Sequence, residues 1–127
     1  MQSSEDGNEG FVMLFTDEGR DTLFPLLQRR QIGHQDVSVL LAVMTHLDWR
    51  SGKARVTQKA LATFTGMRET HVSASVRKLQ RLRLLARVRD SYTGEAFFLL
   101  NPALASVGGP QRRGHLAQQF EEAFGGE

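Results

Sequence analysis

The chain contains no cysteine, a single tryptophan, a single tyrosine and three prolines. Without cysteine it has no disulfide scaffold, thiolate zinc site, iron–sulfur cluster or cysteine nucleophile. The longest nearly apolar run covers residues 37–44, which is too short to span a bilayer, so we expect no contact with a membrane. The first six residues are polar and acidic, unlike a secretory signal. These features predict a cytoplasmic protein.

The rest of the composition is that of one folded domain. The chain has 127 residues, of which 40% are hydrophobic and 24% charged. About two-thirds of the unfolded chain's surface can be buried at this length, so a core forms without disulfides or a metal ion. We expect residues 1–10 to be a flexible acidic tail, residues 11–110 to form the main domain, and residues 111–127 to form a C-terminal helix.

The net charge of +2 conceals an uneven distribution of charge. Residues 1–21 hold six acids and one base, whereas residues 50–89 hold eleven bases and the single acid Glu69, a local net charge of +10. Bases concentrated in this way are typical of a surface that binds a polyanion, most simply nucleic acid. The alternative is a basic face in contact with water alone.

The N-terminal half predicts one strand and two helices. Residues 11–15 form a short apolar run rich in strand formers. A helix over residues 19–30 requires Pro25 to lie in its first turn. A second helix over residues 35–48 has Asp36 as its N-cap, and its apolar residues cover more than half its circumference, which is typical of a buried helix.

The following segment predicts two helices joined by a tight turn. Residues 50–53 form a turn, and residues 55–57 a very short strand. Thr57 is placed to cap a helix over residues 58–64, which Gly66 ends with a positive φ. A second helix runs from residue 68 or 69 to residue 81. One apolar stripe follows it, made of Val72, Val76, Leu79 and Leu82.

A β-hairpin and a last helix complete the chain. The strands cover residues 84–90 and 96–100 around a short loop with Gly94. Asn101 and Pro102 end the second strand, and residues 107–110 form a hinge. The last helix, over residues 111–124, carries Leu116, Phe120 and Phe124 four residues apart. This stripe packs on the chain's own core or on a second copy of the chain, and the second alternative, a homodimer, is slightly favoured.

The order helix, turn, helix, hairpin over residues 57–100 resembles the winged helix-turn-helix of DNA-binding proteins. Residues 56–67 resemble its first helix and turn, and residues 68–79 its recognition helix. The chain resembles the MarR-like winged-helix group, and its layout is similar to that of RepL-type plasmid replication proteins, including the ending at residues 97–104. The resemblance implies an α+β fold, mostly helical, and a winged-helix DNA-binding domain at residues 11–110.

Two positions depart from the group's pattern. The residue before the wing strand is commonly glycine in this group, and here it is Arg83. A residue other than glycine at positive φ costs about 1 kcal/mol, so the bend before the wing strand is expected to differ from the bend that glycine gives in this group. The position after Ser73 is often a long base, and here it is Ala74, which removes one expected contact with DNA.

The helical repeat sorts the side chains of the second helix by direction. With the apolar stripe facing inward, residues 70, 71, 73, 77, 78 and 81 face away from it. A helix in the major groove uses its first residues to read base edges, and the flanking bases contact phosphates. The candidates for base contact are Thr70, His71, Ser73 and Arg77. The candidates for phosphate contact are Thr57, Lys59, Arg68, Lys78, Arg81, Arg87, Arg89, Tyr92 and Thr93.

These features favour a protein that binds double-stranded DNA and controls transcription. One alternative is a plasmid-type replication initiation or copy-control protein, which would use the same surface on an origin. Another is a winged-helix protein–protein adaptor without DNA binding, against which the charge of residues 50–89 argues. The four histidines, at 34, 46, 71 and 115, share no ligand spacing. We therefore expect no metal, no cofactor and no enzymatic activity.

Overall fold

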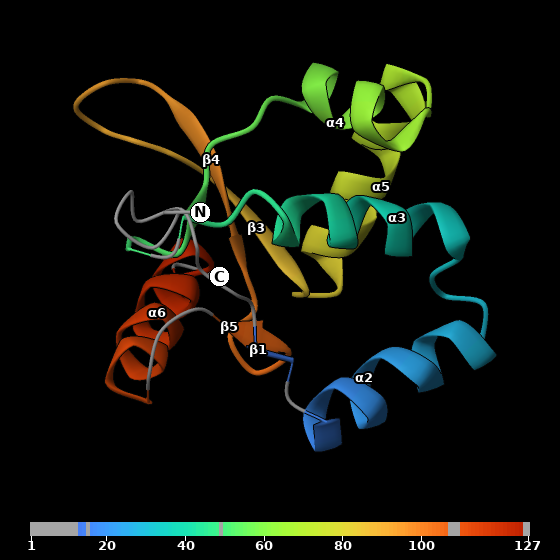
Figure 1. Cartoon of the computed structure of the whole chain (residues 1–127), viewed down its shortest axis with the longest axis horizontal. Coiled ribbons are helices and arrows are strands. Elements are labelled where there is room, and N and C mark those ends of the chain that lie inside the picture. Colours follow the sequence, from blue (N-terminus) through green and yellow to red (C-terminus); the bar gives the residue numbers. More distant parts are fainter. Residues whose placement is uncertain (1–12, 15, 49, 107–109, 126–127) are drawn as a thin grey trace, which may run out of the picture.

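A computed structural model of the chain describes residues 13–14, 16–48, 50–106 and 110–125 (Figure 1). Its elements, in chain order, are β1 (Met13–Leu14), α2 (Thr16–Gln28), α3 (His34–Met44), β2 (Lys53–Ala54), α4 (Gln58–Thr65), α5 (Glu69–Arg81), β3 (Leu85–Arg89), β4 (Ala96–Leu100), β5 (Ala105–Ser106) and α6 (Pro110–Ala123). The described part of the chain is an α+β fold that is mostly helical, as the sequence predicts. Its layout is compatible with a winged helix.

A three-stranded antiparallel sheet in the order β2-β4-β3 lies at the centre of the fold. The predicted hairpin is confirmed: β3 pairs with β4 from Leu85 opposite Leu100 to Arg89 opposite Ala96. Gly94, at φ 73°, lies in the connecting loop. The loop is closed where the Asp90 N–H donates to the Glu95 carbonyl at 2.7 Å. We call this hairpin, residues 85–100, the wing.

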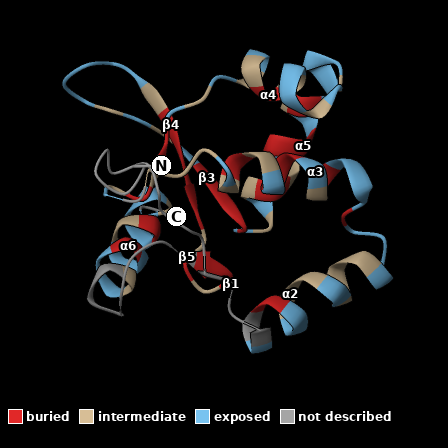
Figure 2. Ribbon diagram, in the orientation of Figure 1, coloured by how far each residue is buried: buried red, intermediate tan, exposed pale blue. Residues whose placement is uncertain are grey.

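The two faces of the sheet contact different helices, as Figures 1 and 2 show. Alternate residues of a strand point to opposite faces. Leu85, Phe98 and Leu100 belong to the core formed with α3, α4 and α5. Phe97 and Leu99 point the other way and pack with Ala86 and Phe120 against α6. The sheet therefore lies between a layer of three helices and the C-terminal helix.

The two helices before the wing begin and end as predicted. Thr57 caps α4, because its Oγ1 accepts a 3.0 Å hydrogen bond from the Ala60 N–H, and Gly66 ends the helix at φ 72°. Of the predicted apolar stripe, Val72, Val76 and Leu79 on α5 are fully buried, and Leu82, which caps the end of the helix, is partly buried. This burial fixes the rotation of α5 and so decides which of its side chains face outward.

The two preceding helices differ from the sequence-based expectation. Helix α2 begins at Thr16, so Pro25 lies in the helix interior rather than in the first turn, where its missing N–H removes one intrahelical hydrogen bond. The N-cap of α3 is Gly33, not Asp36. The Asp36 carboxylate instead reaches back from the third helical position and accepts the Gly33 N–H at 2.9 Å. The expected helix over residues 35–48 ends early, at Met44.

The first strand of the sheet also lies two residues earlier than predicted. It covers Lys53–Ala54 rather than residues 55–57, because Lys53 pairs with Leu99 and Ala54 with Phe98. A second, two-stranded sheet joins β1 to β5, with Met13 opposite Ser106. This pair confirms a strand within residues 11–15. The predicted tail at residues 1–10 and most of the predicted hinge at 107–110 lie outside the described residues.

Candidate nucleic-acid interface

The outward face of α5 carries several of the side chains that the sequence predicts to contact DNA. Thr70, His71, Arg77 and Arg81 are exposed, and Ser73 is half-buried. They face outward because the opposite side of the amphipathic helix is held in the core. The four candidates for base contact therefore share the first two-thirds of one exposed helix face.

The wing lies directly beside this helix. The Arg87 N–H, on β3, donates a 3.0 Å hydrogen bond to Gln80 Oε1, near the end of α5. Arg87 and Arg89 follow Leu85 at intervals of two residues, so they lie on the same face of the sheet as Leu85, the face that packs against α3, α4 and α5. They lie nearer the wing loop than the buried Leu85. Both arginines are exposed. The bases of β3 and of the C-terminal half of α5 therefore lie on adjoining surfaces.

Most of the predicted contact bases have no acid paired with them. Six of the predicted contact bases are exposed and form no salt bridge with any described residue, namely Lys59, Arg68, Arg77, Arg81, Arg87 and Arg89. Two of them make uncharged contacts instead. Arg77 Nη1 donates to Ser73 Oγ at 3.0 Å, and Arg89 Nη1 donates to the Gly94 carbonyl within the wing. These two guanidinium groups are held by neutral partners rather than by acids.

Lys78 differs from the expectation of a free phosphate contact. Its Nζ lies 3.0 Å from Asp36 Oδ2, whose side chain is only 5% exposed. A carboxylate buried in this way needs a counter-charge, and Lys78 supplies it from the edge of α5 that faces α3. The charge of Lys78 is therefore used inside the fold, and we remove this residue from the candidate phosphate contacts.

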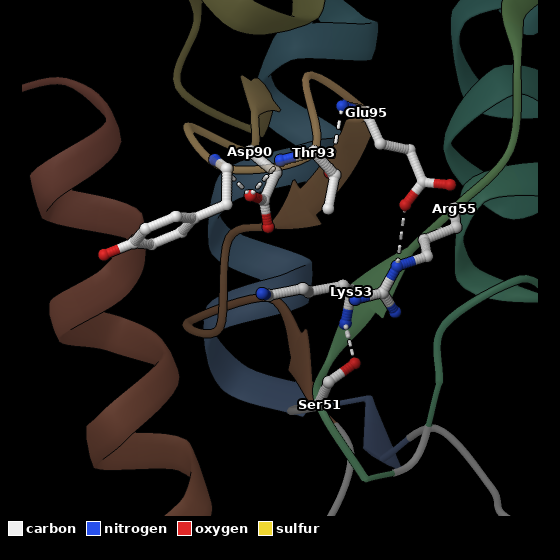
Figure 3. A network of polar contacts seen from close by, with 7 residues as sticks. Ser51, Lys53, Arg55, Asp90, Thr93 and Glu95 are labelled. Carbon is white, nitrogen blue, oxygen red and sulfur yellow. Dashed lines mark hydrogen bonds and ion pairs between the residues drawn. The ribbon is translucent and has the colours of Figure 1, made fainter.

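The wing loop is ordered by its own polar side chains (Figure 3). Asp90 Oδ1 accepts the backbone N–H groups of Thr93 at 3.1 Å and Tyr92 at 2.8 Å, and these hydrogen bonds hold the pKa of Asp90 below its usual value. Thr93 Oγ1 accepts the Glu95 N–H at 3.1 Å. The Tyr92 side chain is 96% exposed. The loop thus presents an aromatic ring to solvent on a fixed backbone.

The second acid of the wing loop is also paired. Glu95 Oε1 lies 3.4 Å from Arg55 Nε, on the segment between β2 and α4 (Figure 3). Thr57, the last residue of that segment, uses its hydroxyl as the cap of α4. Asp90 and Glu95 therefore both have donors of their own, and neither forms a salt bridge with a base of the helix α5.

Three residues with roles at this surface were not singled out by the sequence. Gln80 connects the wing to α5, Arg55 connects the wing loop to the segment before α4, and Ser75 hydrogen-bonds Asp36. Each contact joins residues that are distant in sequence or on different elements. Local spacing carries no signal for such contacts, and the basic run at 50–89 indicates Arg55 only as one charge among eleven.

The C-terminal stripe predicted for a dimer packs within the chain itself. Leu116 and Phe120 are 6% and 3% exposed, and Phe120 contacts the outer face of the sheet. Phe124 is partly buried beside them, with its ring 4.8 Å from the Arg83 guanidinium carbon. The structure therefore places these three side chains in the chain's own core, the alternative that the sequence left open.

Other kinds of site are absent from the described residues. No group of three or more His, Asp or Glu side chains there has the arrangement of a metal site. No helix among them is long and apolar enough to cross a membrane.

No protein family model, curated protein or solved structure matches the chain.

Proposed function

We propose that this protein binds double-stranded DNA with α5 in the major groove and the wing along the sugar–phosphate backbone. The observation that carries the proposal is the Gln80–Arg87 hydrogen bond, which joins a helix with an outward polar and basic face to a strand with two exposed arginines. A helix of this kind fits the major groove, and bases beside it neutralise phosphates.

The division of roles follows from where each side chain lies. Thr70, His71 and Ser73 occupy the N-terminal half of α5, from which helices in the major groove contact base edges, and Arg77 follows one turn after Ser73. Arg77 is already turned towards this part of the helix by its hydrogen bond to Ser73. Phosphate contacts come from the bases around it: Lys59, Arg68, Arg81, Arg87 and Arg89. Tyr92 and Thr93 lie at the far end of the wing and contact the backbone or minor groove.

The role we propose is control of transcription, and the same surface would serve a plasmid replication or copy-control protein on an origin sequence. A protein–protein adaptor is the weaker candidate, because it needs no unpaired bases on this face. A genome-wide map of the sites bound in cells separates the first two roles, since promoters and a replication origin are different targets.

Binding to duplex DNA across a range of salt concentrations tests the proposal directly. If four or five phosphates are neutralised, the logarithm of the association constant falls with the logarithm of salt concentration with a slope of about −4. A protein in which Arg81 and Arg87 are both changed to Ala should have a shallower slope, by about 2. As the matched control, Arg29→Ala with Arg30→Ala removes the same charge from the end of α2 and should leave the slope unchanged. Absence of binding to duplex DNA at low salt would refute the proposal.

A further inference from the structure

A cavity of about 220 Å³ lies between the outer face of the sheet and the C-terminal half of α6. Strands β3 and β4 supply its apolar walls, namely Val88, Phe97 and Leu99. Its polar groups come from β2 and α6, namely Lys53, Gln119 and Glu122. Pockets for drug-sized ligands usually measure about 300–1,000 Å³, so this cavity suits a smaller molecule.

Gln119 has an unused hydrogen-bond acceptor at this cavity. Its Oε1 atom is buried, and no donor among the described residues hydrogen-bonds to it. No other side-chain oxygen or nitrogen in the described part of the chain is buried without a partner. Buried polar atoms in folded proteins nearly always have a partner. Because Gln119 lines the cavity, a ligand with an N–H or O–H group would supply the missing donor.

Lys53 brings a positive charge to the sheet side of the cavity. It lies opposite Leu99 across the strands, so its side chain shares the outer face of the sheet with Leu99 and Phe97. Lys53 Nζ lies 4.7 Å from the centre of the Phe97 ring, and Figure 3 shows the side chain extended towards α6. It forms no salt bridge with any residue that the structure describes, and Asp90 interacts with its charge only at longer range. This ammonium group is therefore available to an anion.

Glu122 adds a second acceptor on the helix side. It follows Gln119 by three residues on α6, so the two side chains lie on the same side of the helix. Glu122 is exposed, its Oε2 accepts Gln118 Nε2 at 3.3 Å, and it has no salt bridge within the described residues. The cavity therefore has acceptors on the helix side, a positive charge on the sheet side, and apolar side chains around them. This combination complements a small zwitterion.

We propose that the cavity binds a free α-amino acid with an apolar side chain. The ammonium group of the amino acid donates to Gln119 Oε1 and to the Glu122 carboxylate, and its carboxylate pairs with the Lys53 ammonium group. Its side chain packs on the apolar walls that β3 and β4 supply. The cavity lies on the face of the sheet opposite to Arg87 and Arg89, so the amino acid and the DNA proposed above occupy different surfaces.

Isothermal titration calorimetry of the full chain without DNA tests the proposal, with L-leucine or L-phenylalanine as the ligand. We expect saturable binding of one molecule per chain. The analogue of each that lacks the amino group, and the analogue that lacks the carboxylate, should bind at least about tenfold more weakly, because each leaves one side of the cavity unpaired. No saturable binding at millimolar concentrations, or equal binding of the analogues, overturns the proposal. Because no DNA is present, this outcome says nothing about DNA binding.

Substitutions in the cavity identify the site. Lys53→Met and Gln119→Leu should each weaken binding at least about tenfold, since each removes one polar partner of the ligand. Lys53→Arg keeps the charge and should bind more tightly than Lys53→Met. Gln28→Leu, at an exposed position on α2, is the matched control for Gln119→Leu and should bind like the original chain. Unchanged binding by either cavity variant would place the ligand elsewhere.

Unfolding by urea gives a second readout. Gln119→Leu replaces an unpaired buried oxygen by an apolar group, so this variant should have a higher urea midpoint than the original chain. The amino acid binds only the folded chain, so L-leucine should raise the midpoint of the original chain and leave that of Gln119→Leu nearly unchanged. Equal shifts in the two proteins would contradict the assignment of Gln119 to the site.

Discussion

Ser75 Oγ, in the middle of α5, donates a 2.6 Å hydrogen bond to Asp36 Oδ1, in the first turn of α3, and both side chains are buried. Asp36 Oδ2 accepts from the Gly33 N–H at 2.9 Å and from Lys78 Nζ at 3.0 Å. Two donors on α5 and the N–H of the residue that caps α3 therefore converge on one carboxylate. This network fixes where α5 lies on α3, and hence how far its outward face projects.

Removing the carboxylate should destabilise the fold. Asp36→Ala leaves the buried Ser75 hydroxyl without its acceptor and Lys78 without its counter-charge, and we expect a loss of about 1–3 kcal/mol in the free energy of unfolding. Urea denaturation measures the loss. Glu69→Ala, an exposed acid on α5, is the control and should change the stability by less than about 0.5 kcal/mol. Equal effects of the two substitutions would show that the network contributes nothing.

The same carboxylate should make stability depend on pH in the acidic range. Burial raises the pKa of Asp36, but the hydrogen bonds from Ser75, Gly33 and Lys78 and the charge of Lys78 outweigh it, so the pKa lies below its usual value of 3.8. A lowered pKa stabilises the fold above the unfolded-state value, and this contribution is lost as pH falls through the folded-state value. Urea midpoints below pH 4 should fall more steeply in the original chain than in Asp36→Asn. If the urea midpoints of the two proteins fall equally with pH, the lowered pKa of Asp36 does not contribute to stability.

Arg77 and Arg81 should differ in how they affect DNA binding. Arg77→Ala should cost about 1–3 kcal/mol of binding free energy on the preferred sequence and little on others, because it removes a base contact. Arg81→Ala should weaken binding to every sequence and reduce the salt slope by about 1. Fluorescence anisotropy with preferred and scrambled duplexes measures both. If Arg77→Ala weakens both duplexes equally, Arg77 is a phosphate contact.

Arg83 should carry backbone strain before the wing. Its φ is 59°, the left-handed region that glycine adopts readily. Arg83→Gly and Arg83→Ala lose the same contacts of the side chain, including the one with Phe124, but only glycine relieves the strain. The glycine variant should therefore be more stable than the alanine variant by about 1 kcal/mol in urea denaturation. Equal stabilities would mean that this bend stores no strain.

Gly52 should tolerate a side chain less well than Gly94. Both have positive φ, 72° and 73°, but a Cβ at Gly52 would meet Leu116 Cδ1 at 2.9 Å, while a Cβ at Gly94 meets nothing within 4 Å. Gly94→Ala should cost about 1 kcal/mol for the backbone alone, and Gly52→Ala more, because Leu116 and α6 must shift. Leu116→Ala should remove that excess in the double variant. A cost at Gly52 equal to that at Gly94 would show that α6 moves freely.

Local signals predicted the segment from Thr57 to Leu100 well. A cap at Thr57, a left-handed turn at Gly66 and the stripe of Val72, Val76 and Leu79 each depend on residues within one or two turns of each other, and the structure confirms all three. The pairing of Lys78 with Asp36 was not predicted, because the two residues lie 42 positions apart. A helical wheel gives the direction in which a side chain points, but it does not give the residue that the side chain contacts in the folded chain.

The sequence by itself determined the amphipathic helices, the hairpin and the position of the basic residues, because helix and strand periodicity and turn chemistry are local. The tertiary structure decided which charged side chains stay available to a ligand. Asp36 forms a salt bridge with Lys78, Glu95 forms one with Arg55, and the hydrogen bond from the Arg87 N–H to Gln80 holds Arg87 beside α5. It also decided that the C-terminal stripe covers the sheet and that Leu23, Leu26 and Leu27 of α2 pack against the core while Phe24 is exposed. These outcomes depend on how layers of the fold pack together, and periodicity within a single element contains no information about its partner.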